Sequence, residues 1–122
     1  DHDGAEPAAS SVSVLNLLRL THLVHEPAWR DRVDRTLALF AEKLEQFGRG
    51  VPMMAAALST RAAGIRQVVV VGDVTGALAR EALVPYRPFS VVLVLTPDQQ
   101  RALAPHLPWL AAMHPVDGQA AA

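Results

Sequence analysis

The hydrophobic pattern of this chain changes its period at Ile65, and that change limits the folds that are open to it. Before this point apolar residues recur every three or four positions, which places them on one face of a helix. After it, the runs 67–72 and 90–95 are dominated by valine and leucine without alternating polar residues. Such runs are typical of strands covered on both faces in a parallel sheet. The sequence therefore predicts a helical part followed by an α/β part.

Three helices are predicted before Ile65. Ser10 or Ser11 is suited to cap the first, and Pro27 and Pro52 suit the first turns of the second and third. The first helix has apolar residues around most of its circumference, whereas the second has one apolar stripe and a charged face. A mostly buried helix followed by a half-exposed one is the pattern of an inner and outer pair in a helical barrel. The expected helices run from about 11 to 24, 27 to 47 and 52 to 63.

The second part of the chain predicts a βαβα unit. Its two strands are expected to be adjacent and parallel, because residues 76–83 are long enough for a right-handed crossover helix. A capping box at Thr96 and Gln99, with Pro97 at the first helical position, predicts a second helix. Two further prolines should break that helix near His106.

Composition narrows the classes of function. The 122 residues, 51% of them hydrophobic, suffice for one globular core. Basic and acidic residues are mixed and the net charge is -1, so the chain lacks the basic stripe that nucleic acid or an anionic membrane requires. Without cysteine it has no disulfide, catalytic thiol or cysteine zinc site. It has no apolar run long enough for a membrane span and no signal segment at its start, so we expect a cytoplasmic protein without nucleic-acid or membrane partners.

The opening residues carry a resemblance to a known family. They read Asp-Gly-Ala-Glu-Pro from Asp3 to Pro7, and Asn-Leu-Leu-Arg-Leu follows from Asn16. With these segments the chain resembles the C-terminal region of the spermatogenesis-associated, thioredoxin-domain-containing (YyaL-type) family. The sequence departs from the family pattern at Ala8 and Ser10, where the family has serine and asparagine. The matching segments are 3–7, 11–13, 16–20, 67–72, 107–110 and 118–120.

The resemblance implies a parent protein in which a thioredoxin-like domain precedes a six-hairpin (α/α) barrel similar to those of glycosidases and sugar epimerases. The chain is then expected to be a fragment with an α/β fold. Residues 1–64 would form the terminal helices of the barrel, and residues 65–122 a βαβα appendage truncated before a third strand. Such a fragment leaves the first helix and the sheet edges without neighbours, so we expect it to self-associate.

Asp3 and Glu6 are the acids beside the start of the first predicted helix. Two carboxylates are what glycoside hydrolysis needs, one as the acid and the other as base or nucleophile. Alternatively, both acids support the positive end of the helix. In barrels of the implied kind, loops that lead into inner helices surround the substrate cavity. We therefore take four residues as candidate sugar-binding residues and leave catalytic residues unassigned. The four are Asp3, Glu6, Asn16 and Arg19.

Two other groups of residues, a glycine-containing loop and a pair of histidines, each have two possible interpretations. The Gly72–Gly76 loop follows a strand and precedes a helix, as phosphate-binding loops do, but a dinucleotide fingerprint needs a third glycine. An ordinary N-cap at Asp73 or Thr75 is the favoured interpretation of that loop. His22 and His25 have the spacing of metal ligands, but no third ligand accompanies them. We therefore expect no metal and no cofactor.

The resemblance thus implies a non-catalytic fragment of a protein that binds or acts on a carbohydrate. One alternative is a protein-interaction module that docks the thioredoxin-like domain or another partner. A second alternative is a small nucleotide-binding unit at residues 72–76. A sugar should perturb residues 3–19, a nucleotide the 72–76 loop, and a partner domain the exposed face of the sheet.

Overall fold

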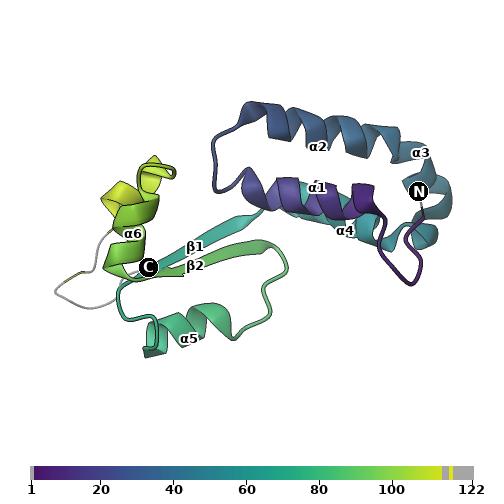
Figure 1. The fold of residues 1–122 in the computed structure, drawn as a ribbon. Coiled ribbons are helices and arrows are strands. Elements are labelled where there is room, and N and C mark those ends of the chain that lie inside the picture. Colours follow the sequence, from purple (N-terminus) through teal and green to yellow (C-terminus); the bar gives the residue numbers. More distant parts are fainter. Residues whose placement is uncertain (1, 114–115, 117–122) are drawn as a thin grey trace. The chain divides into compact units, whose positions relative to one another are not determined.

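The computed structural model describes residues 2–113 and residue 116. The chain forms two compact units, Asp1–Ile65 and Arg66–Ala122. Helices make up the first unit, and the second contains the sheet (Figure 1). The elements of the first unit are α1 (Ala9–Leu20), α2 (Pro27–Leu39), α3 (Ala41–Phe47), the 3-10 helix η1 (Gly48–Gly50) and α4 (Pro52–Ala63). Those of the second are β1 (Arg66–Val71), α5 (Ala77–Leu83), β2 (Ser90–Leu95), α6 (Pro97–Leu103) and the 3-10 helix η2 (Pro108–Ala112).

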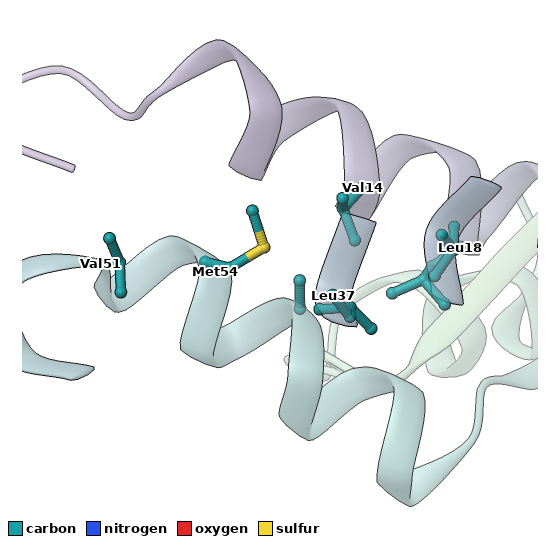
Figure 2. Close-up of a cluster of buried hydrophobic side chains, with 7 residues drawn as sticks. Val14, Leu18, Leu37, Val51 and Met54 are labelled. Carbon is teal, nitrogen blue, oxygen red and sulfur yellow. The ribbon is translucent and has the colours of Figure 1, made fainter. Parts of the chain in front are cut away.

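In the helical unit, α1 packs against both α2 and α4 (Figure 1). Figure 2 shows Val14 and Leu18 from α1 in one cluster with Leu37 from α2 and Met54 from α4. Met54 is completely buried. The prediction of a mostly buried first helix is wrong, because only Ser11, Val14 and Leu18 are buried in α1 although it packs against two helices. The full cluster is Val14, Leu18, Val33, Leu37, Val51, Met54 and Ala57.

The first helix ends earlier than the sequence predicts. It stops at Leu20 instead of Val24. The N–H of His22 donates to the carbonyl of Arg19 at 3.1 Å, and the N–H of Leu23 to that of Leu20 at 2.9 Å. This i to i−3 pattern is 3-10 geometry, which often closes the last turn of a helix and uses its remaining carbonyls. The prediction missed this tightening because apolar residues continue through the turn.

The start of α1 also differs from the prediction. Its N-cap is Ala8, not Ser10 or Ser11, and the methyl side chain of Ala8 makes no capping hydrogen bond. Ser11 instead lies in the first turn of the helix, where it is buried. Its hydroxyl donates to the Asp3 carboxylate at 3.2 Å. The serine thus reaches an acid outside the helix and does not cap the helix backbone.

The predicted single helix from 27 to 47 is wrong in one respect, because it breaks at Phe40 into α2 and α3. Phe40 has φ -95° and ψ 0°, and its N–H is shared between the carbonyls of Thr36 and Leu37. Phe40 and Leu44 both pack against the core. Phe47, the last residue of α3, is exposed. The third predicted helix is confirmed as α4.

The predicted pairing of the second unit is confirmed. β1 and β2 are parallel neighbours, in a register that runs from Arg66 opposite Ser90 to Val71 opposite Leu95. The crossover helix α5 connects them. The capping box at the start of α6 is also confirmed, since Thr96 accepts from the N–H of Gln99 and its own N–H donates to the Gln99 side chain.

Coverage of this sheet is less complete than predicted. Only Val69–Val71 are buried in β1, and only Leu95 in β2. Helices α5 and α6 have seven residues each, which makes them about 10 Å long, whereas a strand of six residues spans about 20 Å. Helices this short cannot cover the whole sheet, so it is buried mainly at its carboxyl end. The third strand expected after the Gly118–Ala120 step lies outside the described residues.

Candidate functional site

The most elaborate polar site in the described residues is built around Asp3, which is buried with 7% of its surface exposed. One carboxylate oxygen accepts the N–H of Ala8 at 2.7 Å. The other accepts the N–H groups of Met53 and Met54 at 2.9 and 3.2 Å, and the hydroxyl of Ser11. A single side chain therefore joins the loop before α1, the first turn of α1 and the first turn of α4.

The start of α4 explains why an acid is needed there. Its N-cap, Val51, has no side-chain acceptor, and Pro52 follows at the first helical position. Met53 and Met54 then carry N–H groups that have no partner within the helix. An N-cap side chain usually accepts these groups, and here Asp3 does so from fifty residues away. The N–H of Asp3 also donates to the carbonyl of Gly50 at 3.1 Å, which holds the loop in place.

Electrostatics keep the Asp3 carboxyl ionised. Burial raises its pKa, but the hydrogen bonds from Ala8, Ser11, Met54 and Met53 together outweigh burial, and the pKa lies below its ordinary value. The N-termini of two twelve-residue helices add positive partial charge beside the carboxylate. Asp3 is therefore ionised, and its carboxylate oxygens accept hydrogen bonds that hold the starts of α1 and α4.

The four candidate residues differ in their exposure to solvent. Glu6 is exposed in the loop before α1, while Asp3 is buried. Asn16 and Arg19 are exposed on α1, one helical turn apart. Asp3 fits the interpretation that an acid supports a helix N-terminus. It does not form an open carboxylate pair with Glu6.

A second polar site, which the sequence did not reveal, lies at the other end of α1. A hollow of about 90 Å³ is lined there by basic side chains from three elements: His22 after α1, Arg30 in α2 and Arg61 in α4. A wider hollow of about 270 Å³ adjoins it and shares Thr21 and Arg30. The other lining residues of the first hollow are Leu18, Thr21, Val33, Thr60, Gly64 and Ile65. Those of the second are His25, Glu26, Pro27 and Asp31.

Arg61 is fixed by an ion pair across the helices. Its Nε donates to one oxygen of Asp34 at 2.8 Å and its Nη2 to the other at 3.1 Å. This hydrogen-bonded guanidinium lowers the pKa of Asp34, and the carboxylate raises the pKa of Arg61. Both side chains are almost half exposed, so the pair stabilises the fold by about 0–1 kcal/mol. Nothing in the local sequence marks residues 27 apart as partners.

His22 lies in a cationic environment. Burial lowers the pKa of its imidazole, and the nearby charge of Arg30 lowers it further. His22 and His25 each line one of the two hollows, but no group of three or more His, Cys, Asp or Glu side chains gathers within residues 2–113. Within the described part of the chain, His22 and His25 are therefore not joined by further metal-ligating side chains.

The Gly72–Gly76 loop is occupied by its own acid. One oxygen of the Asp73 carboxylate accepts both the N–H of Thr75, at 2.9 Å, and its hydroxyl, at 2.7 Å. These bonds, the hydroxyl first, lower the pKa of Asp73. The N-cap of α5 is Gly76, so neither Asp73 nor Thr75 has the predicted capping position. A phosphate at this loop would meet a carboxylate and amides that are already in use, which disfavours the nucleotide alternative.

Comparison with known proteins covers the whole chain. The chain is 34% identical to a human protein over 126 aligned residues and 35% identical to the rat counterpart of that protein over 124. The chain is similar to spermatogenesis-associated protein 20. It spans only 16% of the length of that protein. An uncharacterized protein of Caenorhabditis elegans is 35% identical over 81 residues, or 66% of the chain. No family model and no solved structure matches.

The similarity to spermatogenesis-associated protein 20 includes both compact units, because the alignment with the human protein covers 100% of the chain. None of the helices in the described part of the chain is both long and apolar enough to cross a membrane.

Proposed function

We propose that the chain is a non-catalytic C-terminal region of a larger, cytoplasmic protein of the spermatogenesis-associated, thioredoxin-domain-containing kind. In this proposal the larger protein holds a thioredoxin-like domain and a six-hairpin (α/α) barrel, and the barrel binds or acts on a carbohydrate. Two observations support it. The chain matches only 16% of spermatogenesis-associated protein 20, and its first unit contains a pair of packed helices, α1 and α2, joined by residues 21–26.

The outer face of α1 supports the barrel origin. Val12 and Leu20 remain partly exposed there although the opposite face packs against α2 and α4. Asn16 and Arg19 lie among them. A face that mixes apolar residues with an amide and a guanidinium suits the lining of a sugar cavity, where apolar surface meets ring carbons and polar groups meet hydroxyls. We propose this face as the sugar-facing surface of the intact barrel.

The surroundings of the Asp3 carboxylate support the proposal that this region is not catalytic. A glycosidase needs a general acid with a raised pKa and a second carboxylate about 5–9.5 Å away across the scissile bond. Asp3 has a lowered pKa and four donors from its own chain, and Glu6 is exposed. Such an acid stabilises helix ends and is poorly placed for proton transfer to a substrate.

The proposal is tested first by the sequence that flanks this chain. A Cys-x-x-Cys motif and five further helical hairpins upstream are expected, and their absence would overturn the parent architecture. In the longer protein, Arg19→Gln is expected to weaken binding of a neutral monosaccharide such as glucose by about tenfold, the loss of roughly one hydrogen-bonded contact. Arg32→Gln, an exposed arginine on α2, is the matched control and should leave binding unchanged.

Catalysis is tested separately. Glu6→Gln in the longer protein should leave any turnover of nitrophenyl glycosides unchanged, because Glu6 is proposed to have no role in proton transfer. Loss of turnover in Glu6→Gln with an unchanged melting temperature would show that this region is catalytic. Unchanged turnover together with weakened binding in Arg19→Gln would support a purely binding role.

A second candidate function, a protein-interaction module, is favoured by the end of α5 and the loop that follows it. Its large apolar residues are unusually exposed: Leu83 58%, Val84 80%, Tyr86 91% and Phe89 40%. Contiguous exposed apolar residues of this kind mark interaction surfaces. Binding to the thioredoxin-like domain, measured by sedimentation, should weaken with Tyr86→Ser. If that variant binds as the wild type does, this candidate function is excluded for the loop.

Self-association of the isolated chain follows from the same exposure. The residues available for it on α1 are Val12 and Leu20, because Leu18 is buried and Leu15 packs partly buried against the core. We propose that the isolated chain forms dimers or larger species at micromolar concentration. Sedimentation velocity that shows a monodisperse monomer across that range would contradict this.

A further inference from the structure

The smaller hollow at the end of α1 holds a concentration of positive charge. Arg30 and Arg61 line it together with His22, and no carboxylate is among its lining residues. Asp34 interacts electrostatically with both arginines and already accepts two hydrogen bonds from Arg61. Among the described residues, Arg61 therefore has a hydrogen-bonded carboxylate partner, whereas Arg30 does not.

Arg30 is the unmatched group. Its guanidinium makes no hydrogen bond or ion pair within residues 2–113 or with residue 116, although its charge acts on both His22 and Asp34. It is also the fourth residue of α2, close to the positive end of a thirteen-residue helix. The positive end of the helix is unfavourable for a cation, and the exposed guanidinium has donors available for a ligand. An anion placed beside Arg30 would interact favourably with both the guanidinium and the helix end.

The size of the hollow limits what can enter it. A volume of about 90 Å³ is roughly that of three water molecules, each of which takes about 30 Å³ in the liquid. Pockets for drug-sized ligands begin near 300 Å³. A phosphate or carboxylate group fits this hollow, whereas a whole sugar ring would need the adjoining wider hollow as well. Arginine is the residue of choice for such planar or tetrahedral oxyanions because its donors form a fixed fork.

We propose that this hollow binds one small oxyanion group, a phosphate or a carboxylate, with Arg30 as its principal ligand and His22 beside it. The hydroxyls of Thr21 and Thr60 line the same space but donate to the carbonyls of Leu18 and Ala56. The site therefore depends on the basic groups. Glu26 and Asp31 line the wider hollow. Any part of the ligand that extends from the oxyanion group into the wider hollow should therefore be uncharged or cationic.

The test titrates inorganic phosphate and, in a separate arm, acetate into the 122-residue chain at constant ionic strength. Side-chain signals of His22, Arg30 and Arg61 are followed by NMR. Saturable shifts are expected, with a millimolar dissociation constant for the better anion, and the arm that saturates identifies the source. The pKa of His22 should rise on binding, because the anion opposes the effect of Arg30.

Arg30→Gln should weaken this binding at least tenfold, whereas Arg32→Gln on the same helix removes the same charge outside the hollow and should change it less than twofold. Both residues are exposed, so neither variant threatens folding. Shifts that do not saturate with either anion would overturn the proposal. Equal losses in the two variants would also overturn it, since they would indicate screening by the general ion atmosphere.

Discussion

The two units of this chain hold themselves together in different ways. In the helical unit the decisive polar contacts join residues far apart in sequence, such as Asp3 with Met53 and Arg61 with Asp34. In the second unit the side-chain contacts at helix starts are local, as between Thr96 and Gln99. Its long-range order comes from the backbone ladder between β1 and β2. The helical unit therefore depends on side-chain contacts between distant residues, whereas the second unit depends mainly on its strand ladder, on local caps and on the buried Gln100, whose side chain donates to the carbonyl of Leu110 ten residues away.

This difference leads to different sensitivities to mutation. A buried acid that satisfies two helix starts has no substitute nearby, so its loss leaves several donors without partners. A non-proline substitution in a strand keeps the backbone N–H and C=O groups that form the ladder, so the polar contacts of the sheet depend less on the identity of single side chains. The following predictions compare the two units in that light.

The largest loss is expected from the helical core. Met54→Ala removes a completely buried side chain that Figure 2 shows among residues of α1 and α2, and it should cost about 2–5 kcal/mol in the free energy of unfolding. Leu58→Ala on the same helix is the control, since Leu58 is 44% exposed and should cost much less. Urea unfolding measures both variants. Equal losses would mean that the buried cluster is not the core of this unit.

Asp3→Asn should cost roughly 2–3 kcal/mol, because the amide group replaces an acceptor oxygen with a donor where N–H groups converge. Asp73→Asn makes the same chemical change in the exposed loop of the second unit, where its partner is two residues away, and should cost less than about 0.5 kcal/mol. Thermal unfolding of the two variants is the comparison. A larger loss of stability in Asp73→Asn would show that the helical unit is not the unit that depends more on its polar side-chain contacts.

The same contrast explains what the sequence could predict. The capping box at Thr96 and the valine-rich strands are local signals, and both predictions are confirmed. The role of Asp3 depends on the start of α4 arriving beside it, which no local pattern encodes. The break at Phe40 and the hollow around Arg30 likewise arise from how the helices pack. Sequence analysis singled out Asp3 and His22 but could not place their partners.

Acid should weaken the helical unit through Asp3. Its folded-state pKa lies below the ordinary value, so the unfolded chain binds the proton first as the pH falls. The stability contributed by Asp3 is therefore complete above the unfolded pKa of about 4 and is lost as the pH drops through the folded pKa. The loss should be smaller than that in Asp3→Asn, because a protonated carboxyl keeps an acceptor oxygen. Urea unfolding between about pH 6 and pH 3 should show a flatter profile in Asp3→Asn than in the wild type.

In the second unit, Thr96→Ala removes the local cap of α6 and should cost about 1 kcal/mol. Thr96→Ser keeps the hydroxyl and serves as the control, with a loss of a few tenths of a kcal/mol at most. Hydrogen exchange at the amides of α6 measures the effect locally. Unchanged exchange in Thr96→Ala would mean that Pro97 and packing define the helix start without the capping box.

The smallest effect is expected from Ala8→Ser, which supplies a local cap where α1 has none. Ala8 already has the extended backbone of an N-cap, with φ -65° and ψ 143°, so a serine hydroxyl should accept the N–H of Ser11 without rearrangement and add about 0.5 kcal/mol. The gain should be larger in the Asp3→Asn background, because a local acceptor then takes over part of the role of the distant acid. A double-mutant cycle by urea unfolding measures that coupling. Equal gains in both backgrounds would show that Asp3 contributes nothing to the start of α1, and that its importance lies in α4 alone.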